Sequence, residues 1–235
     1  MDPRAASSGA GANEGAGDWV VELSCGHHQH VRHRPPWESR PWVATAEGRQ
    51  ERIGRRHPCG TCAQATAGLS ARARERIASL DLVPHPEGGF YRETYRSAMV
   101  LDAATPARKR SASTAIYFLI PRGSFSAFHR ILSDEVWHFY EGAPLEVVML
   151  GEGGRSTITL GTDFSKGEVP QGVVPAGIWF ASHLANDETG DYALVGCTVA
   201  PGFDFEDFEM ADREALAALF PEHRAEITSL TRLST

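Results

Sequence analysis

The chain has 235 residues, of which 42% are hydrophobic and 23% charged, and its formal net charge is −7. This composition is typical of a soluble globular protein, and it excludes a collagen, a long coiled coil and a wholly disordered chain. No apolar run approaches the roughly 20 residues that a membrane helix needs, and no signal peptide is visible at the N-terminus. The acidic balance argues against a general nucleic-acid binder. We therefore expect a cytoplasmic protein with no membrane partner.

The composition changes along the chain. Residues 1–17 are mostly Ala, Gly and Ser, which predicts a disordered tail because so little apolar surface can be buried. Residues 18–62 hold three of the four cysteines and five of the ten histidines, with a net charge of about +2, whereas residues 63–235 carry about −8. This contrast predicts two modules, 18–62 and 71–235, joined by a linker at 63–70.

The first module is too small to be stabilised by an apolar core alone, so we expect an additional stabilising cross-link, such as a bound metal. Cys59 and Cys62 form a CxxC pair that suits tetrahedral zinc. A hairpin turning at residues 26–29 would place Cys25 opposite His30. We therefore predict a zinc-ribbon-like module with a structural zinc on Cys25, His30, Cys59 and Cys62, and with His27 as the competing fourth ligand.

Other interpretations of the small module remain open. Cys59 and Cys62 could be a redox pair or unligated thiols, and the seven arginines could bind nucleic-acid phosphates, although we favour a solvated basic face. The motifs CGHxQHVRHRPPW, RPWV and the terminal CxxC resemble those of a small uncharacterised bacterial family, from about Trp19 to Cys62. The resemblance implies a fold but no activity.

The second module alternates short strands with Gly and Pro. Helices are predicted at residues 71–80 and 212–220, and the many short strands favour a sandwich or barrel. The predicted fold is therefore all-β with flanking helices. The expected strands are Tyr91–Tyr95, Thr114–Ile120, Ser126–Ile131, Glu135–Tyr140, Leu145–Leu150, Ser156–Leu160, Gly172–Val174, Gly177–Ala181 and Tyr192–Val199.

Four long motifs of this module resemble an uncharacterised branch of the RmlC-like cupin superfamily. They are HPEGGFYRETYRS (85–97), DEVWHFYEG (134–142), VPAGIWF (174–180) and GCTVAPGFDFEDFE (196–209), and the match runs from about residue 69 to 220. The resemblance implies a double-stranded β-helix, or jelly roll, and a homodimer formed by sheet extension. It also suggests sugar or nucleotide-sugar ligands.

The metal-binding motifs of cupins are incomplete in this sequence. His129 and Glu135 keep the spacing of the first motif, but its second histidine position is Ile131. The histidine of the second motif is replaced by Phe180. Since stable sites usually have three or more protein ligands, we expect no metal in the barrel.

His129 and Glu135 remain candidates for acid–base catalysis. The resemblance to the cupin motif implies that the strand faces carrying them point into the lumen, where burial would bring both pKa values toward neutrality. The alternatives are ligand binding without catalysis and a structural hydrogen bond between two strands. Cys197 lies in an apolar strand and is expected to be a buried core thiol.

The segment HPEGGFYRETYRS carries two further features. Gly88 and Gly89 permit positive φ or a close approach to a ligand. Arg92 could bind a carboxylate or phosphate, although an ordinary salt bridge is the interpretation that we favour. The residues expected to contact the ligand are Arg92, Tyr95, Tyr117, Trp137 and Phe180.

Three hypotheses for function follow. The first is an epimerase-like or isomerase-like enzyme that acts on a small metabolite, with His129 as base and Glu135 tuning it. The second is a non-catalytic module that senses or binds a metabolite. The third is a metal-dependent oxygenase or isomerase with an altered ligand set. Fold resemblance alone does not choose among them.

Overall fold

The computed structural model describes residues 17–23, 27–33, 40–54, 59–104, 107–185 and 190–232. The chain divides into two compact units, residues 1–67 and 68–235. This boundary falls inside the segment 63–70 that we expected as a linker, although the first part of that segment is helical. None of the helices in the described ranges combines the length and the apolar character that a membrane span requires.

The first unit contains a hairpin and short helices. Its elements are β1 (Gly17–Glu22), β2 (His28–His33), the 3-10 helix η1 (Pro41–Val43), α1 (Ala46–Gln50) and α2 (Gly60–Thr66). The hairpin differs from the expected one, because His30 pairs with Val20 and the Leu23 amide donates to His27 O. Pairing thus continues through His28, and the expected pairing of Cys25 with His30 is wrong. Cys25 lies outside the described residues, as does the predicted tail apart from Gly17.

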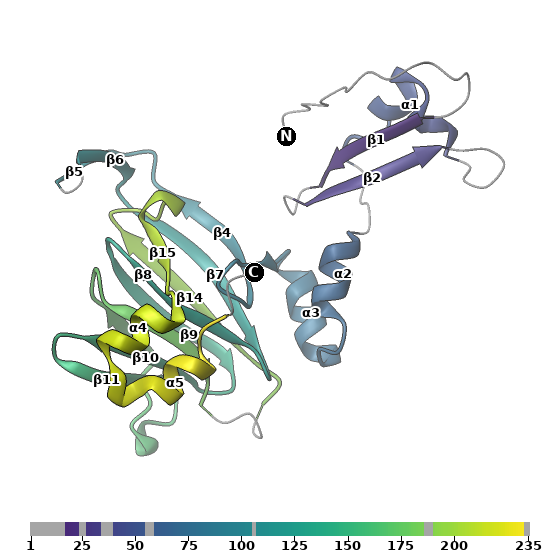
Figure 1. Cartoon of the computed structure of the whole chain (residues 1–235). Coiled ribbons are helices and arrows are strands. Elements are labelled where there is room, and N and C mark those ends of the chain that lie inside the picture. The colour runs from purple at the N-terminus through teal and green to yellow at the C-terminus, as the bar shows by residue number, and fades with distance from the viewer. Residues whose placement is uncertain are drawn as a thin grey trace. The chain divides into compact units, whose positions relative to one another are not determined.

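The second unit consists of two antiparallel sheets with helices outside them (Figure 1). The six-stranded sheet has the order β12-β9-β14-β7-β4-β3, the five-stranded sheet has the order β11-β10-β13-β8-β15, and β5 pairs with β6 as a separate hairpin. Its strands are β3 (Val83–Pro84), β4 (Phe90–Arg96), β5 (Val100–Ala104), β6 (Ala107–Ser111), β7 (Thr114–Pro121), β8 (Phe125–Ile131), β9 (Asp134–Gly142), β10 (Leu145–Gly151), β11 (Gly154–Leu160), β12 (Gln171–Val174), β13 (Trp179–Leu184), β14 (Tyr192–Ala200) and β15 (Phe208–Met210).

Three α-helices lie on the outer faces of the sheets: α3 (Ala71–Ser79), α4 (Arg213–Leu219) and α5 (Arg224–Ser229). The unit also contains the 3-10 helices η2 (Phe164–Lys166), η3 (Phe205–Asp207) and η4 (Pro221–His223). Leu216 of α4 and Ile227 of α5 pack on the five-stranded sheet, whereas Ile77 of α3 packs on the six-stranded sheet. Ser70 and Asp212 cap α3 and α4 through side-chain oxygens that accept backbone N–H groups. Burial of these apolar faces holds the helices in place.

Nearly all the expected strands are present, so the all-β prediction with flanking helices is confirmed. The expected strand Gly177–Ala181 begins later, at Trp179, because Gly177 has a positive φ of 77°. The sequence reasoning missed β3, β5, β6, β15 and α5. Between the two sheets lies the main core, which includes Phe118, Trp137 and Phe180.

Candidate functional site

A cavity of about 200 Å³ opens into the second unit. Its inner lining includes the buried side chains of His85, Glu87, His129, Glu135 and Cys197. Four ionisable groups and a thiol in one small apolar enclosure mark it as the candidate site, since perturbed ionisable groups gather at functional sites.

The segment between β3 and β4 places His85 and Glu87. Gly88 N–H donates to His85 O (3.0 Å), and His85 N–H donates to Gly89 O (3.1 Å). Gly88 and Gly89 have φ values of +116° and +67°, so the positive φ allowed for on the sequence is present at both positions. The Ala127 amide donates to Glu87 O (2.9 Å) and ties this turn to β8.

Glu87 and His129 form a buried pair. Glu87 Oε2 lies 3.2 Å from His129 Nε2, and Glu87 Oε1 accepts from Ser126 Oγ (2.9 Å). His129 Nδ1 lies 2.7 Å from Ala127 O, which can only accept, so Nδ1 carries the hydrogen. Burial raises the pKa of Glu87 and lowers the pKa of His129 to about 4. The proton between them therefore resides on Glu87, which donates to Nε2 of a neutral imidazole.

Glu135 is the second buried carboxyl of the cavity. Burial raises its pKa to about 8, the Glu87 carboxyl adds to the rise, and Cys197 and Trp137 oppose it. Burial also raises the pKa of the Cys197 thiol, so the expected buried core thiol also lines the cavity. At neutral pH the Glu135 carboxyl and the Cys197 thiol are consequently protonated and uncharged.

Aromatic side chains form much of the wall. His85 lies edge-on to Tyr91, with ring centroids 4.5 Å apart, and stacks with Phe205 at 6.0 Å. Phe203 contacts Phe205 edge-on at 5.0 Å. Phe205 is half-exposed, whereas His129 is buried, which identifies the Phe205 end as the mouth.

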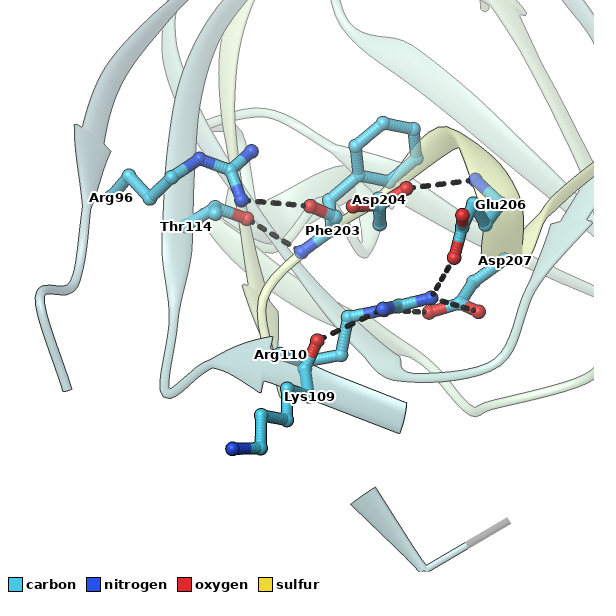
Figure 2. Close-up of polar contacts among 8 residues, drawn as sticks. All are labelled: Arg96, Lys109, Arg110, Thr114, Phe203, Asp204, Glu206 and Asp207. Carbon is cyan, nitrogen blue, oxygen red and sulfur yellow. Dashed lines mark hydrogen bonds and ion pairs between the residues drawn. The ribbon is translucent and has the colours of Figure 1, made fainter. Parts of the chain in front are cut away.

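The loop at this mouth is held from several sides (Figure 2). Thr114 Oγ1 accepts from Phe203 N–H (2.9 Å), and Arg96 donates to Phe203 O (3.2 Å). Arg110, from β6, binds both carboxylate oxygens of Asp207, at 2.6 and 2.9 Å. These bonds order the loop that carries Phe203 and Phe205.

Three residues expected to contact the ligand lie elsewhere. Arg92 is on the outer face of the sheet, where its guanidinium lies 3.6 Å from Asp81 and 5.7 Å from the centre of the Tyr117 ring. Arg92 thus forms an ordinary salt bridge, with Asp81. Tyr95 is exposed after a β-bulge, and Tyr117 packs near α3. None of the three lines the cavity, so their placement there was wrong. Arg92 and Tyr117 lie on the outer face of the sheet, and the strand register shifts between Glu93 and Tyr95.

Two further expected residues are buried beside the site. Phe180 lies over His129, with ring centroids 4.0 Å apart, and Trp137 contacts both Phe118 and Phe180 edge-on. The Trp137 Nε1 atom is buried without a hydrogen-bond partner in the described part of the protein. Both side chains support the inner wall rather than the mouth.

The sequence reasoning missed several lining residues, including His85, Glu87, Glu93, Arg96 and Asp204. Alternation along β4 already placed Glu93 on the face opposite Arg92, which is the face that lines the cavity. In the motif HPEGG we interpreted only the two glycines. A turn that needs two residues with positive φ also fixes the side chains that precede it, which here are His85 and Glu87.

A divalent metal does not fit the donor atoms of the barrel. Ile131 and Phe180 offer no ligand atom, and both ring nitrogens of His129 already face protein oxygens. Within the described ranges, no group of three His, Cys, Asp or Glu side chains is arranged to hold a metal. The hypothesis of a metal-dependent oxygenase or isomerase therefore gains no support.

The proposed zinc ligands lie in the first unit. Cys59 directly precedes α2, and Cys62 falls in its first turn. His30 lies on β2, and His27 precedes that strand. Cys25 and the side chain of Cys62 lie outside what the structure describes, so the zinc-ribbon-like assignment stays a prediction.

Several solved structures and one curated protein are similar to this chain. The uncharacterized protein YML079W of Saccharomyces cerevisiae is 32% identical over 170 residues, which is 67% of this chain and 85% of the yeast protein. A hypothetical protein from Leishmania major is 36% identical with a TM-score of 0.65, covering 68% of this chain and 99% of that one. Protein SO0799 from Shewanella oneidensis is 42% identical with a TM-score of 0.62, covering 69% and 98%. These likenesses support the jelly-roll fold.

Two family models match the chain. One is described as a protein of unknown function (DUF3565) and matches residues 12–66. The other is described as the cupin superfamily (DUF985) and matches residues 74–211, which is more than half of the chain. With the yeast relative, this match shows that the chain belongs to the DUF985 family of the cupin superfamily.

Proposed function

We propose that the barrel cavity binds a small uncharged metabolite of the sugar class and transfers a proton to or from it. The observation that carries this proposal is the juxtaposition of a protonated carboxyl, Glu135, with the buried Glu87–His129 pair inside one aromatic-walled cavity. Protonated carboxyls and neutral imidazoles at neutral pH are suited to general acid–base catalysis.

Size and charge favour a small neutral ligand. A cavity of about 200 Å³ lies below the roughly 300–1,000 Å³ of drug-sized pockets. A sugar ring suits this space, whereas the nucleotide of a nucleotide-sugar would have to extend through the mouth. Arg96, the arginine among the described residues that line the cavity, is bound by both carboxylate oxygens of Glu93, at 2.9 and 2.6 Å. This pairing leaves it poorly placed to attract a phosphate.

The proposed chemistry assigns different tasks to the two carboxyls. Glu135 donates its proton to a ligand oxygen, because its raised pKa keeps it protonated near neutrality. The group of His85, Glu87 and His129 accepts a proton from the ligand. The aromatic walls give the site a lower local dielectric constant than water, which would strengthen these polar contacts.

A screen of the full chain tests this proposal. Monosaccharides, sugar nucleotides and organic acids are first tested by thermal shift, and each stabilising compound is incubated with the protein in deuterium oxide. We expect a monosaccharide to bind and to exchange a carbon-bound hydrogen, as followed by proton NMR. Glu135→Gln should slow the exchange by about 100-fold or more, whereas Glu152→Gln, at an exposed turn, should leave it unchanged.

The second candidate function is metabolite binding without catalysis. It is favoured by the apolar side chains at two motif positions, Ile131 and Phe180, and by the engagement of both nitrogens of His129. A compound that stabilises the protein but shows no hydrogen exchange would support this function. If no compound in the panel stabilises the protein, both functions are contradicted.

We further propose that the first unit holds a structural zinc through Cys25, Cys59, Cys62 and either His27 or His30. The CxxC pair at the start of α2 supports this proposal, because two cysteines follow one another within one turn of chain. Plasma mass spectrometry of the full chain should find about one zinc per molecule. Cys59→Ser should lose most of it, whereas Cys197→Ser, in the barrel, should retain it. Equal zinc in both variants would contradict this ligand set.

A further inference from the structure

His129 has no ring nitrogen left for a ligand. Its Nδ1 donates to Ala127 O at 2.7 Å, and its Nε2 lies 3.2 Å from Glu87 Oε2. The ring lies between Phe180 and Phe208, with centroid distances of 4.0 and 5.2 Å, and only 3% of the residue is exposed. A ligand could reach either nitrogen only by breaking one of these contacts.

His85 is arranged differently within the same group. Its Nδ1 faces Glu87, at 3.4 Å from Oε2 and 3.4 Å from the backbone nitrogen. No hydrogen bond to its Nε2 is present in the described ranges. His85 lines the cavity and stacks with the half-exposed Phe205, so it lies between the inner carboxyls and the mouth.

In both neutral tautomers of His85, the Nε2 atom can contact a ligand. With the hydrogen on Nδ1, the ring donates to Glu87 Oε2, and Nε2 is a base. With the hydrogen on Nε2, Nδ1 accepts from the Glu87 backbone N–H, and Nε2–H is an acid. The other groups around the ring are His129 and the aromatic rings of Tyr91, Phe118, Phe205 and Phe208.

We infer that His85, through Nε2, is the group that exchanges a proton with a ligand in this cavity, and that Glu87 is the positioning residue that holds its Nδ1. This inference rests on the proposed proton transfer. The ligand proton moves to Nε2 while the electron pair of its former bond stays on the ligand, and Glu135 supplies the proton that a ligand oxygen gains. The imidazolium formed is stabilised by Glu87 Oε2 at Nδ1.

Chemical labelling of the full chain tests which imidazole is available. Diethyl pyrocarbonate modifies unprotonated, accessible imidazole nitrogens, and peptide mass spectrometry reports each site separately. With the exposed His28 as the internal reference, we expect His85 to be labelled at least tenfold faster than His129 at neutral pH. Labelling of His129 as fast as His85, or protection of both residues, would overturn the inference.

The role of Glu87 is tested by the pH profile of the same labelling. Glu87 Oε2 can accept a hydrogen bond from Nδ1–H of a charged His85, whereas the amide nitrogen that Glu87→Gln would place there cannot, so this variant should move the midpoint for His85 to lower pH. If the midpoint of His85 labelling is the same in the variant and the wild type, Glu87 is not the positioning residue.

A functional comparison separates this inference from the proposed function. With the compound identified in the panel, His85→Gln should slow hydrogen exchange by about 100-fold or more, and exchange at the wild-type rate would overturn the catalytic role. If no compound binds, the proposed function fails, while the labelling experiment still decides which imidazole faces the cavity.

Discussion

Replacing Glu87 with alanine should lower the free energy of unfolding of the barrel by about 3 kcal/mol or more. The change removes the acceptor of Ser126 Oγ and the donor to His129 Nε2, both of which are buried. Each buried polar group left without a partner costs about 1–3 kcal/mol. Urea unfolding followed by circular dichroism measures the loss.

Glu87→Gln is the matched control for this prediction. Its amide can accept from Ser126 and donate to His129 Nε2, as the protonated carboxyl does, so its stability should lie within about 1 kcal/mol of the wild type. If the glutamine variant is destabilised as strongly as the alanine variant, Glu87 is ionised and His129 carries the proton. The comparison therefore determines the charge state of the pair.

Gly88→Ala should destabilise the barrel by about 3 kcal/mol or more, which would lower its melting temperature by about 6–12 °C. Gly88 has a φ of +116°, and a Cβ atom there would collide with the carbonyl oxygen of Phe125 and with the side chain of Arg232. The strain would act directly on the turn that places His85 and Glu87. Thermal unfolding measures the effect.

Gly123→Ala separates the two causes of that loss. Gly123 also has a positive φ, of 72°, but a Cβ atom would have open space around it. Its replacement should therefore cost only about 1 kcal/mol, from the backbone conformation alone. Equal losses at the two glycines would show that the close approach of β8 to Gly88 is unimportant.

Strand content was predictable because it depends on short stretches of sequence. The cupin motif together with strand alternation placed His129 and Glu135 inside the barrel, where both line the cavity. The same rule failed for Arg92, because alternation divides side chains between two faces without saying which face is the lumen. Packing of α3 on the outer face made that choice.

The hairpin of the first unit shows a similar limit. The sequence indicated two arms around a glycine, but the pairing register depends on where the turn closes. The Leu23–His27 hydrogen bond closes it early, so His30 lies opposite Val20. A shift of register changes every cross-strand pair, and turn geometry rather than strand composition determines it.

The sequence by itself indicated two modules, determined the all-β class and made His129 and Glu135 candidates, because composition, periodicity and motif spacing are local properties. The jelly roll followed from the resemblance of its motifs to those of cupins. Only the tertiary structure decided that His85 and Glu87 join them, since the Glu87–Ser126 contact spans 39 residues and depends on the packing of the β3–β4 turn against β8. Burial of these side chains in the folded protein also shifted their pKa values, for example those of His129 and Glu135. The penalty for burying a charge depends on surrounding atoms that come from distant parts of the chain.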